Sequence, residues 1–189
     1  MKVVAFNSSP RKNGNTQQML NAVADELQKE NIEVEHIRIG GQLLHGCIAC
    51  GSCSKHKGRC IQDDDPMNDW IAKMTGADGI LLGSPTYFAT LNTEMKALID
   101  RCGYVLRQTG DLRLKVGAPV VVARRGGAIQ TYNTLMAFFG INEMIVPSSF
   151  YWNMGYGLAV GDVLSDDEGM ETMRQLGRNM AFVLKKVRG

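Results

Sequence analysis

The segment Val3-Val4-Ala5-Phe6-Asn7-Ser8-Ser9-Pro10-Arg11-Lys12-Asn13-Gly14-Asn15-Thr16 joins a short apolar run to a polar turn. The apolar run predicts a buried β-strand, and the periodic apolar residues that begin after the turn predict a helix. A polar, glycine-containing turn before a helix is a common phosphate site, because the helix N-terminus supplies free N–H groups and positive potential. The segment therefore predicts an α/β unit with an anion site at its turn.

The same alternation of apolar runs and amphipathic stretches continues along the chain. Five apolar runs predict strands, at residues 3–6, 34–39, 79–83, 116–123 and 144–146. Five periodic apolar faces predict helices, at 16 to about 30 and near 67–74, 95–102, 132–139 and 173–187. Nearly continuous apolar strands separated by helices indicate a parallel sheet covered on both faces. We expect an α/β fold with a doubly wound five-stranded parallel sheet.

Length and charge narrow the range of functions. The 189 residues suit a single domain over residues 1–189, and 21 basic against 19 acidic side chains give a net charge of only +2. Neither nucleic acid nor a membrane is therefore an expected partner. The chain passes from Met1 directly into a strand, and no apolar stretch approaches the roughly 20 residues of a spanning helix. We expect a cytoplasmic protein that works on small-molecule or protein partners.

Four of the five cysteines form a compact group, C-x2-C-x2-C-x6-C, in a loop at about residues 46–61. Cys47, Cys50, Cys53 and Cys60 have the close spacing of metal or iron–sulfur ligands, and a reducing compartment disfavours disulfides. Thiolates alone do not select the metal, so an iron–sulfur cluster, structural zinc and free redox-active thiols all stay open. His56 is an alternative ligand or simply an exposed side chain. The fifth cysteine, Cys102, lies on an apolar helix face and is predicted to be buried and inert.

The polar turn offers hydrogen-bond donors suited to a dianion. Ser9, Arg11, Asn15 and Thr16 supply hydroxyl, guanidinium and amide groups around the predicted helix N-terminus. The turn contains neither G-x-G-x-x-G nor G-K-[ST], so a monophosphate is preferred to a dinucleotide or a nucleoside triphosphate. The alternative is an ordinary polar turn with an asparagine cap.

Two further turns follow predicted central strands, at the sheet edge where open α/β folds bind ligands. In the segment 83–92, Tyr87 and Phe88 could flank a planar ring and the backbone of Thr86 to Phe88 could bind its edge, or the aromatic rings could simply cover the sheet end. In Arg124-Arg125-Gly126-Gly127, the glycines allow close approach to a ligand and an arginine could stabilise an anionic reduced ring. Solvated arginines are the alternative. A redox metal next to a phosphate-bearing cofactor would indicate electron transfer.

Three motifs together carry a resemblance that spans nearly the whole chain. The motifs SSPRKNGNT (8–16), GSPTYFATLNTEMKALIDR (83–101) and RRGG (124–127) resemble the NAD(P)H-dependent FMN reductase group of flavodoxin-like proteins. With the cysteine motif, the sequence is most similar to the iron–sulfur flavoproteins, in which FMN and a four-iron four-sulfur (4Fe-4S) cluster share a site. The resemblance implies a flavodoxin-like fold and a homodimer or a dimer of dimers.

The resemblance also assigns roles to individual residues. It implies that the FMN phosphate is held by a polar set: Ser9, Arg11, Asn13, Asn15 and Thr16. It implies that the isoalloxazine ring is framed by a second set: Pro85, Thr86, Tyr87, Phe88, Gly126 and Gly127, with Arg125 nearby. The four cysteines would hold the cluster.

The function expected from these features is that of an FMN-dependent oxidoreductase of the iron–sulfur flavoprotein type. It would move electrons between a reduced donor and a small acceptor, with the chemistry on FMN rather than on a catalytic side chain. One alternative is a cluster-free NAD(P)H-dependent FMN or quinone reductase, which binds NAD(P)H transiently. Another is a non-catalytic flavin- or zinc-binding interaction protein.

Overall fold

A single parallel sheet organises the protein in the computed structural model, which describes residues 1–189. Its strand order is β2-β1-β3-β5-β6, and each neighbouring pair is parallel. Its strands are β1 (Lys2–Asn7), β2 (Glu33–Arg38), β3 (Gly79–Tyr87), β5 (Val116–Ala123) and β6 (Met154–Tyr156), with β4 (Thr90–Leu91) pairing antiparallel to the end of β3. The predicted doubly wound five-stranded parallel sheet is confirmed.

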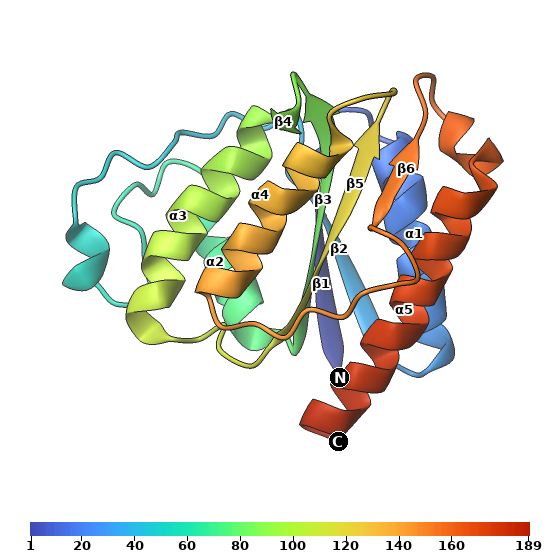
Figure 1. The fold of residues 1–189 in the computed structure, drawn as a ribbon. Helices are drawn as coiled ribbons and strands as arrows, with labels where there is room; N and C mark the ends of the chain where they lie inside the picture. Colours follow the sequence, from blue (N-terminus) through green and yellow to red (C-terminus); the bar gives the residue numbers. More distant parts are fainter.

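Helices cover both faces of this sheet (Figure 1). The helices are α1 (Asn15–Lys29), α2 (Met67–Gly76), α3 (Thr93–Thr109), α4 (Ala128–Ile141) and α5 (Asp167–Arg188), with short 3-10 turns η1 (Ser52–Ser54) and η2 (Asp162–Ser165). Helices α1 and α5 pack together on one face, and α2, α3 and α4 lie on the other. No helix has the combination of length and apolar character that crossing a membrane requires.

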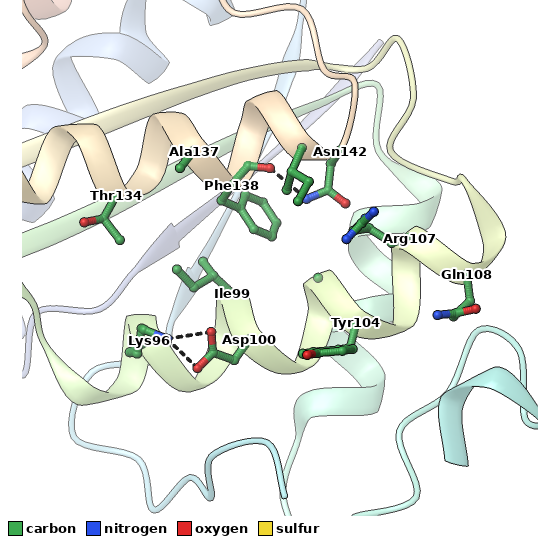
Figure 2. Close-up of a pocket in the computed structure, with 12 residues that line it drawn as sticks. Lys96, Ile99, Asp100, Tyr104, Arg107, Gln108, Thr134, Ala137, Phe138 and Asn142 are labelled. Atoms are coloured by element: carbon green, nitrogen blue, oxygen red, sulfur yellow. Dashed lines mark hydrogen bonds and ion pairs between the residues drawn. The ribbon is translucent and has the colours of Figure 1, made fainter. Parts of the chain in front are cut away.

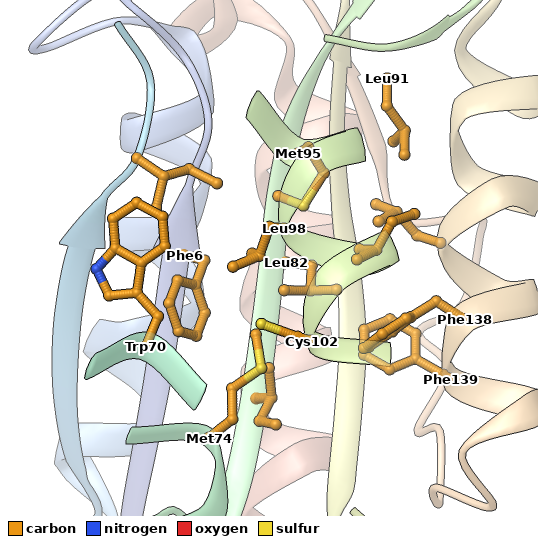
Figure 3. Close-up of a cluster of buried hydrophobic side chains, with 14 of the residues drawn as sticks. Phe6, Trp70, Met74, Leu82, Leu91, Met95, Leu98, Cys102, Phe138 and Phe139 are labelled. Carbon is orange, nitrogen blue, oxygen red and sulfur yellow. The ribbon is translucent and has the colours of Figure 1, made fainter. Parts of the chain in front are cut away.

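The core has two parts, one on each face of the sheet. The larger part packs α2, α3 and α4 against the sheet and contains Phe6, Trp70 and Phe139 (Figure 3). Cys102 lies in this cluster, fully buried, with its sulfur 3.5 Å from that of Met67. Burial raises the pKa of the Cys102 thiol. The predicted burial of this cysteine in the core is confirmed.

One predicted strand is wrong. The apolar run 144–146 forms only an isolated parallel bridge between Ile145 and Val116, and the edge of the sheet is formed further along the chain by β6. Pro147 follows this run directly, and proline cannot donate the hydrogen bond that a continuing ladder needs. The chain then leaves the sheet and returns at Met154, opposite Val121.

Candidate functional site

The carboxyl ends of β1, β3 and β5 meet the N-terminus of α1 around a cavity of about 130 Å³. This is the edge of a doubly wound sheet at which ligands bind. Its lining includes Ser9, Arg11, Asn15, Thr16, Pro85, Thr86, Tyr87, Arg124 and Leu158. The structure thus brings together two predicted groups of residues that lie about seventy positions apart in the sequence.

The N-terminus of α1 points free donors at this cavity. The helix begins after Gly14, no side chain caps it, and its first turn carries no acidic residue. The backbone N–H groups of Asn15 and Thr16 donate to no acceptor in the chain. The side chains of Ser9 and Thr16 are buried beside them, at 5% and 1% exposed. An uncapped, buried helix terminus is stable only with an acceptor, so this geometry suits an anion.

Thr86 provides a second unpartnered donor in the same cavity. Its Oγ1 is buried and has no hydrogen-bond partner. A buried hydroxyl without a partner costs about 1–3 kcal/mol, and such groups are rare in native proteins. The hydroxyl therefore indicates that a polar ligand group belongs beside Thr86.

Asn15 and Arg11 hold a distant segment over the cavity. The Asn15 side chain donates to the Ala159 carbonyl over 2.8 Å and accepts from the Gly161 N–H over 2.9 Å. Arg11 Nη1 donates to the Leu158 carbonyl over 2.7 Å. The Asn15 amide is therefore committed to positioning the 158–161 segment, a role that the sequence did not predict.

The back of the turn is packed against Gly40, at the end of β2. A Cβ atom placed on Gly40 would lie 2.1 Å from the Ser9 carbonyl oxygen and 2.2 Å from its carbon. No side chain fits there without moving the backbone of Ser9. Gly40 was missed from the sequence because the contact joins two segments about thirty residues apart.

A strained hairpin stands at the mouth of the cavity. The turn between β3 and β4 places Phe88 and Ala89 at positive φ, 48° and 60°, although neither residue favours that region. Phe88 is fully exposed, at 105% of its reference area. Gly127 lies against this hairpin, since a Cβ on it would be 2.8 Å from the Ala89 Cα.

Five predicted residues do not line the cavity. Asn13, Phe88, Arg125 and Gly126 are exposed outside it, and Gly127 packs against the hairpin. The arginine that lines the cavity is Arg124. The RRGG turn therefore reaches the cavity through Arg124, and Gly127 supports the hairpin beside it.

The four cysteines lie in the long connection between β2 and α2, on the outer side of α3 (Figure 1). All four line one cavity of about 140 Å³, in which nine of the twelve lining residues are hydrophobic. Cys53 and Cys60 pack against the core, whereas Cys47 and Cys50 are exposed. All are free thiols, and no three His, Cys, Asp or Glu side chains converge closely enough to hold a single metal ion. His56 is exposed and lies outside the cavity lining.

Hydrogen bonds lower the pKa of the Cys50 thiol, first from the Ser52 side chain and then from the backbone. The local turn therefore favours a thiolate, the form that binds metal.

Arg101 is a buried charge beside this cavity and was not singled out from the sequence. Its side chain is 0% exposed and forms an ion pair with Asp65, which is 3% exposed. Burial tends to lower the pKa of Arg101, but hydrogen bonds and charge from Asp65 and Cys60 raise it overall. The sequence did contain an indication of this burial, because Arg101 lies three residues after Leu98 and four before Val105, on the apolar face of its helix.

A larger groove of about 700 Å³ lies between α3 and α4 (Figure 2). It shares no residue with the cavity at the strand ends, but Tyr104 lines both this groove and the cysteine cavity. Gly103 and Phe138 form its middle, and Asp100, Tyr104 and Arg107 line it from α3. Lys96 binds both carboxylate oxygens of Asp100.

The fold and the two sites define a class: a doubly wound α/β protein with an anion-binding helix terminus and a four-cysteine loop. Residues 1–159 match the family described as NADPH-dependent FMN reductase. Two curated relatives, both iron–sulfur flavoproteins of Methanocaldococcus jannaschii, are 40% and 33% identical and align over 100% of this chain and of their own length. A flavodoxin, WrbA-like protein from Agrobacterium tumefaciens has the same fold, with a TM-score of 0.67, 20% identity and coverage of 99% and 98% of the two chains.

The chain therefore belongs to the NADPH-dependent FMN reductase family, in its iron–sulfur flavoprotein group. The resemblance and the flavodoxin-like fold expected from the sequence are confirmed. Membership supports an FMN-dependent oxidoreductase.

Proposed function

We propose that this protein is an FMN-dependent oxidoreductase that passes electrons between FMN and an iron–sulfur cluster. One observation carries the flavin assignment: the uncapped N-terminus of α1 and the unpartnered Thr86 hydroxyl border the same cavity. The names of the full-length relatives, iron–sulfur flavoproteins, support both cofactors.

The FMN phosphate would be held by the turn that leaves β1. The hydroxyls of Ser9 and Thr16 and the N–H groups of residues 15 and 16 are the donors available to it, and the helix terminus adds positive potential. Arg11 and Asn15 hold the 158–161 segment over the same place. Asn13, which is exposed, would contribute only at the rim.

The isoalloxazine ring would lie against the segment Pro85 to Phe88 and Gly127. FMN supplies the redox chemistry, because its ring can exchange a hydride or single electrons. Thr86 would donate to the ring edge, and Tyr87 and Phe88 would shield one side from water. The exposed Arg125 and Gly126 could approach a ring that extends beyond the cavity. Transient NAD(P)H is the proposed hydride donor.

The four cysteines would hold a 4Fe-4S cluster. They share one largely apolar cavity, and their C-x2-C-x2-C-x6-C spacing is typical of iron–sulfur ligands. The free thiols and the absence of disulfides agree with a reducing, cytoplasmic setting.

A homodimer through the α3–α4 groove completes the proposal. Helix α4 has no charged residue in its 14 positions, which is unusual for an exposed helix. An antiparallel copy of α3 centred between Gly103 and Tyr104 would set Asp100 opposite Arg107 of the partner subunit and bring Tyr104 beside Gly103.

We expect Arg107→Glu to shift the protein toward monomer in light scattering. The double variant with Arg107→Glu and Asp100→Lys should form the dimer again, because the two charges of the pair are exchanged. A monomeric wild type, or no shift in the variant, would rule this interface out.

Purification under anaerobic conditions tests both cofactors. The expected protein is brown, with flavin bands, about one FMN per chain and about four iron and four sulfide per chain. A protein that contains FMN but no iron would support the alternative of a cluster-free reductase. A protein that contains zinc but no flavin would support the alternative of an interaction protein. Reduction of bound FMN by NADPH or NADH in a stopped-flow spectrometer identifies the donor.

A further inference from the structure

We propose that Arg101 is the positioning residue of the four-cysteine site: it holds both arms of the loop in place and keeps a positive charge beside the ligand Cys60. This inference rests on the proposed cluster for its redox part. The positioning part concerns the loop alone.

Arg101 contacts both arms of the loop from a rigid helix. Its Nη1 donates to the His45 carbonyl over 3.2 Å, before the first cysteine. Its Nη2 donates to the Gln62 carbonyl over 2.9 Å, after the last cysteine. Residues 45 and 62 bracket all four cysteines, so the guanidinium links the two arms from the helix side. The Gln62 side chain adds a direct hydrogen bond to the Gly46 carbonyl over 3.1 Å.

Burying the Arg101 charge costs free energy of hydration, and the packing of the core does not need a charge at this position. A buried ion pair contributes little net stability compared with a well-packed apolar pair, because both charges lose their hydration. Arg101 and Asp65 are nevertheless both buried, and Asp65 also accepts from the Met67 N–H over 3.2 Å at the start of α2. The pair therefore fixes where the loop ends as well as how it closes.

Arg101 is also turned toward the cysteines. It lines their cavity, and its Nε is buried without a hydrogen-bond partner. Three of its five N–H groups donate to the two loop carbonyls and Asp65, and the Nε–H is one of the two that remain, next to the cavity that the four thiols line. Donors and positive charge near cluster sulfurs stabilise the more negative, reduced form.

The test compares Arg101→Lys and Arg101→Met with Arg113→Lys, an exposed arginine just after the same helix that pairs with Glu143 and contacts neither arm. Amide hydrogen exchange is measured over residues 42–62 of the protein as purified, together with FMN content. We expect Arg101→Lys to keep FMN and to exchange at least tenfold faster in this segment, because lysine cannot bridge both arms. The Arg113→Lys control should exchange like wild type. Wild-type exchange in Arg101→Lys, or equal acceleration in the control, would overturn the positioning role.

The cluster gives the second readout. Iron per chain should fall at least twofold in Arg101→Met, and the midpoint potential of the remaining cluster should be lower than in Arg101→Lys, which keeps the charge. Equal potentials in the two variants would overturn the electrostatic role. If wild type contains no iron, the proposed cluster fails, while the exchange experiment still decides whether Arg101 positions the loop.

Discussion

The turn that leaves β1 and the cysteine loop are both candidate cofactor sites, but they are held in different ways. The turn is fixed by its own strand and helix, with Ser9 and Thr16 buried and Gly40 packed behind it. The loop contains one short 3-10 turn and exposes Cys47 and Cys50. It is tied to α3 through Arg101 and to α2 through the hydrogen bonds between Asn68 and Cys60. The proposed flavin site is therefore preorganised by the fold, whereas the proposed cluster site depends on a few polar contacts around one buried ion pair and on its cofactor.

Removing the carboxylate of Asp65 gives the largest expected effect. Asp65→Ala leaves the Arg101 charge buried without its partner, and breaking a buried pair in this way costs about 3–5 kcal/mol. Urea unfolding measures the loss. Asp64→Ala is the matched control, because the neighbouring carboxylate is 69% exposed, and it should change stability by less than about 0.5 kcal/mol. An equal loss of unfolding free energy in Asp65→Ala and Asp64→Ala would show that the pair of Arg101 and Asp65 does not hold the loop in place.

A side chain at Gly40 should damage the flavin site instead. In Gly40→Ala the new Cβ would overlap the Ser9 backbone, so we expect a loss of about 1–3 kcal/mol in stability and weaker FMN binding. The control is Gly46→Ala, where a Cβ meets nothing within 4 Å. Thermal unfolding with and without added FMN measures both effects. An FMN affinity in Gly40→Ala equal to that of wild type would contradict a rigid, preorganised turn after β1.

The sequence predicts the turn that leaves β1 better than the cysteine loop, because the turn is fixed by local pattern and the loop by long-range contacts. Strand and helix periodicity located β1, α1 and Ser9 to Thr16, because local pattern determines them. The roles of Asn15 and Arg101 depend on partners such as Ala159 and His45, which lie far away in the chain. The fifth strand was misplaced because the three residues of β6, Met154–Tyr156, have no strand pattern of their own, whereas 144–146 has one.

Thr86 separates ligand binding from stability. Thr86→Val removes a buried hydroxyl that has no partner in the chain, so the apoprotein should be as stable as wild type or slightly more stable. FMN affinity should fall about tenfold, since the ligand loses one hydrogen bond. Fluorescence titration of FMN measures the affinity, with the exposed Thr90→Val as control. Unchanged affinity combined with lower stability would contradict the assignment of this hydroxyl to the ligand.

The smallest effect concerns the reactivity of Cys50 in metal-free protein. The Ser52 hydroxyl lowers the pKa of Cys50, so at pH 7 a larger fraction is thiolate than in Ser52→Ala. Iodoacetamide should therefore modify Cys50 a few times more slowly in the variant, and the difference should vanish above about pH 10, where the thiol is ionised in both. Peptide mass spectrometry follows the rate, with Cys47 as internal reference. Identical modification rates of Cys50 at pH 7 in the two proteins would show that Ser52 does not favour the Cys50 thiolate.

The central claim is that the N-terminus of α1 binds the phosphate of FMN. Calorimetric titration of the metal-free apoprotein with FMN and with riboflavin, which lacks the phosphate, tests it most directly. We predict that FMN binds at least about 100-fold more tightly, a difference of about 2.7 kcal/mol from charge-assisted hydrogen bonds to the dianion. Equal affinities for the two flavins would contradict the account.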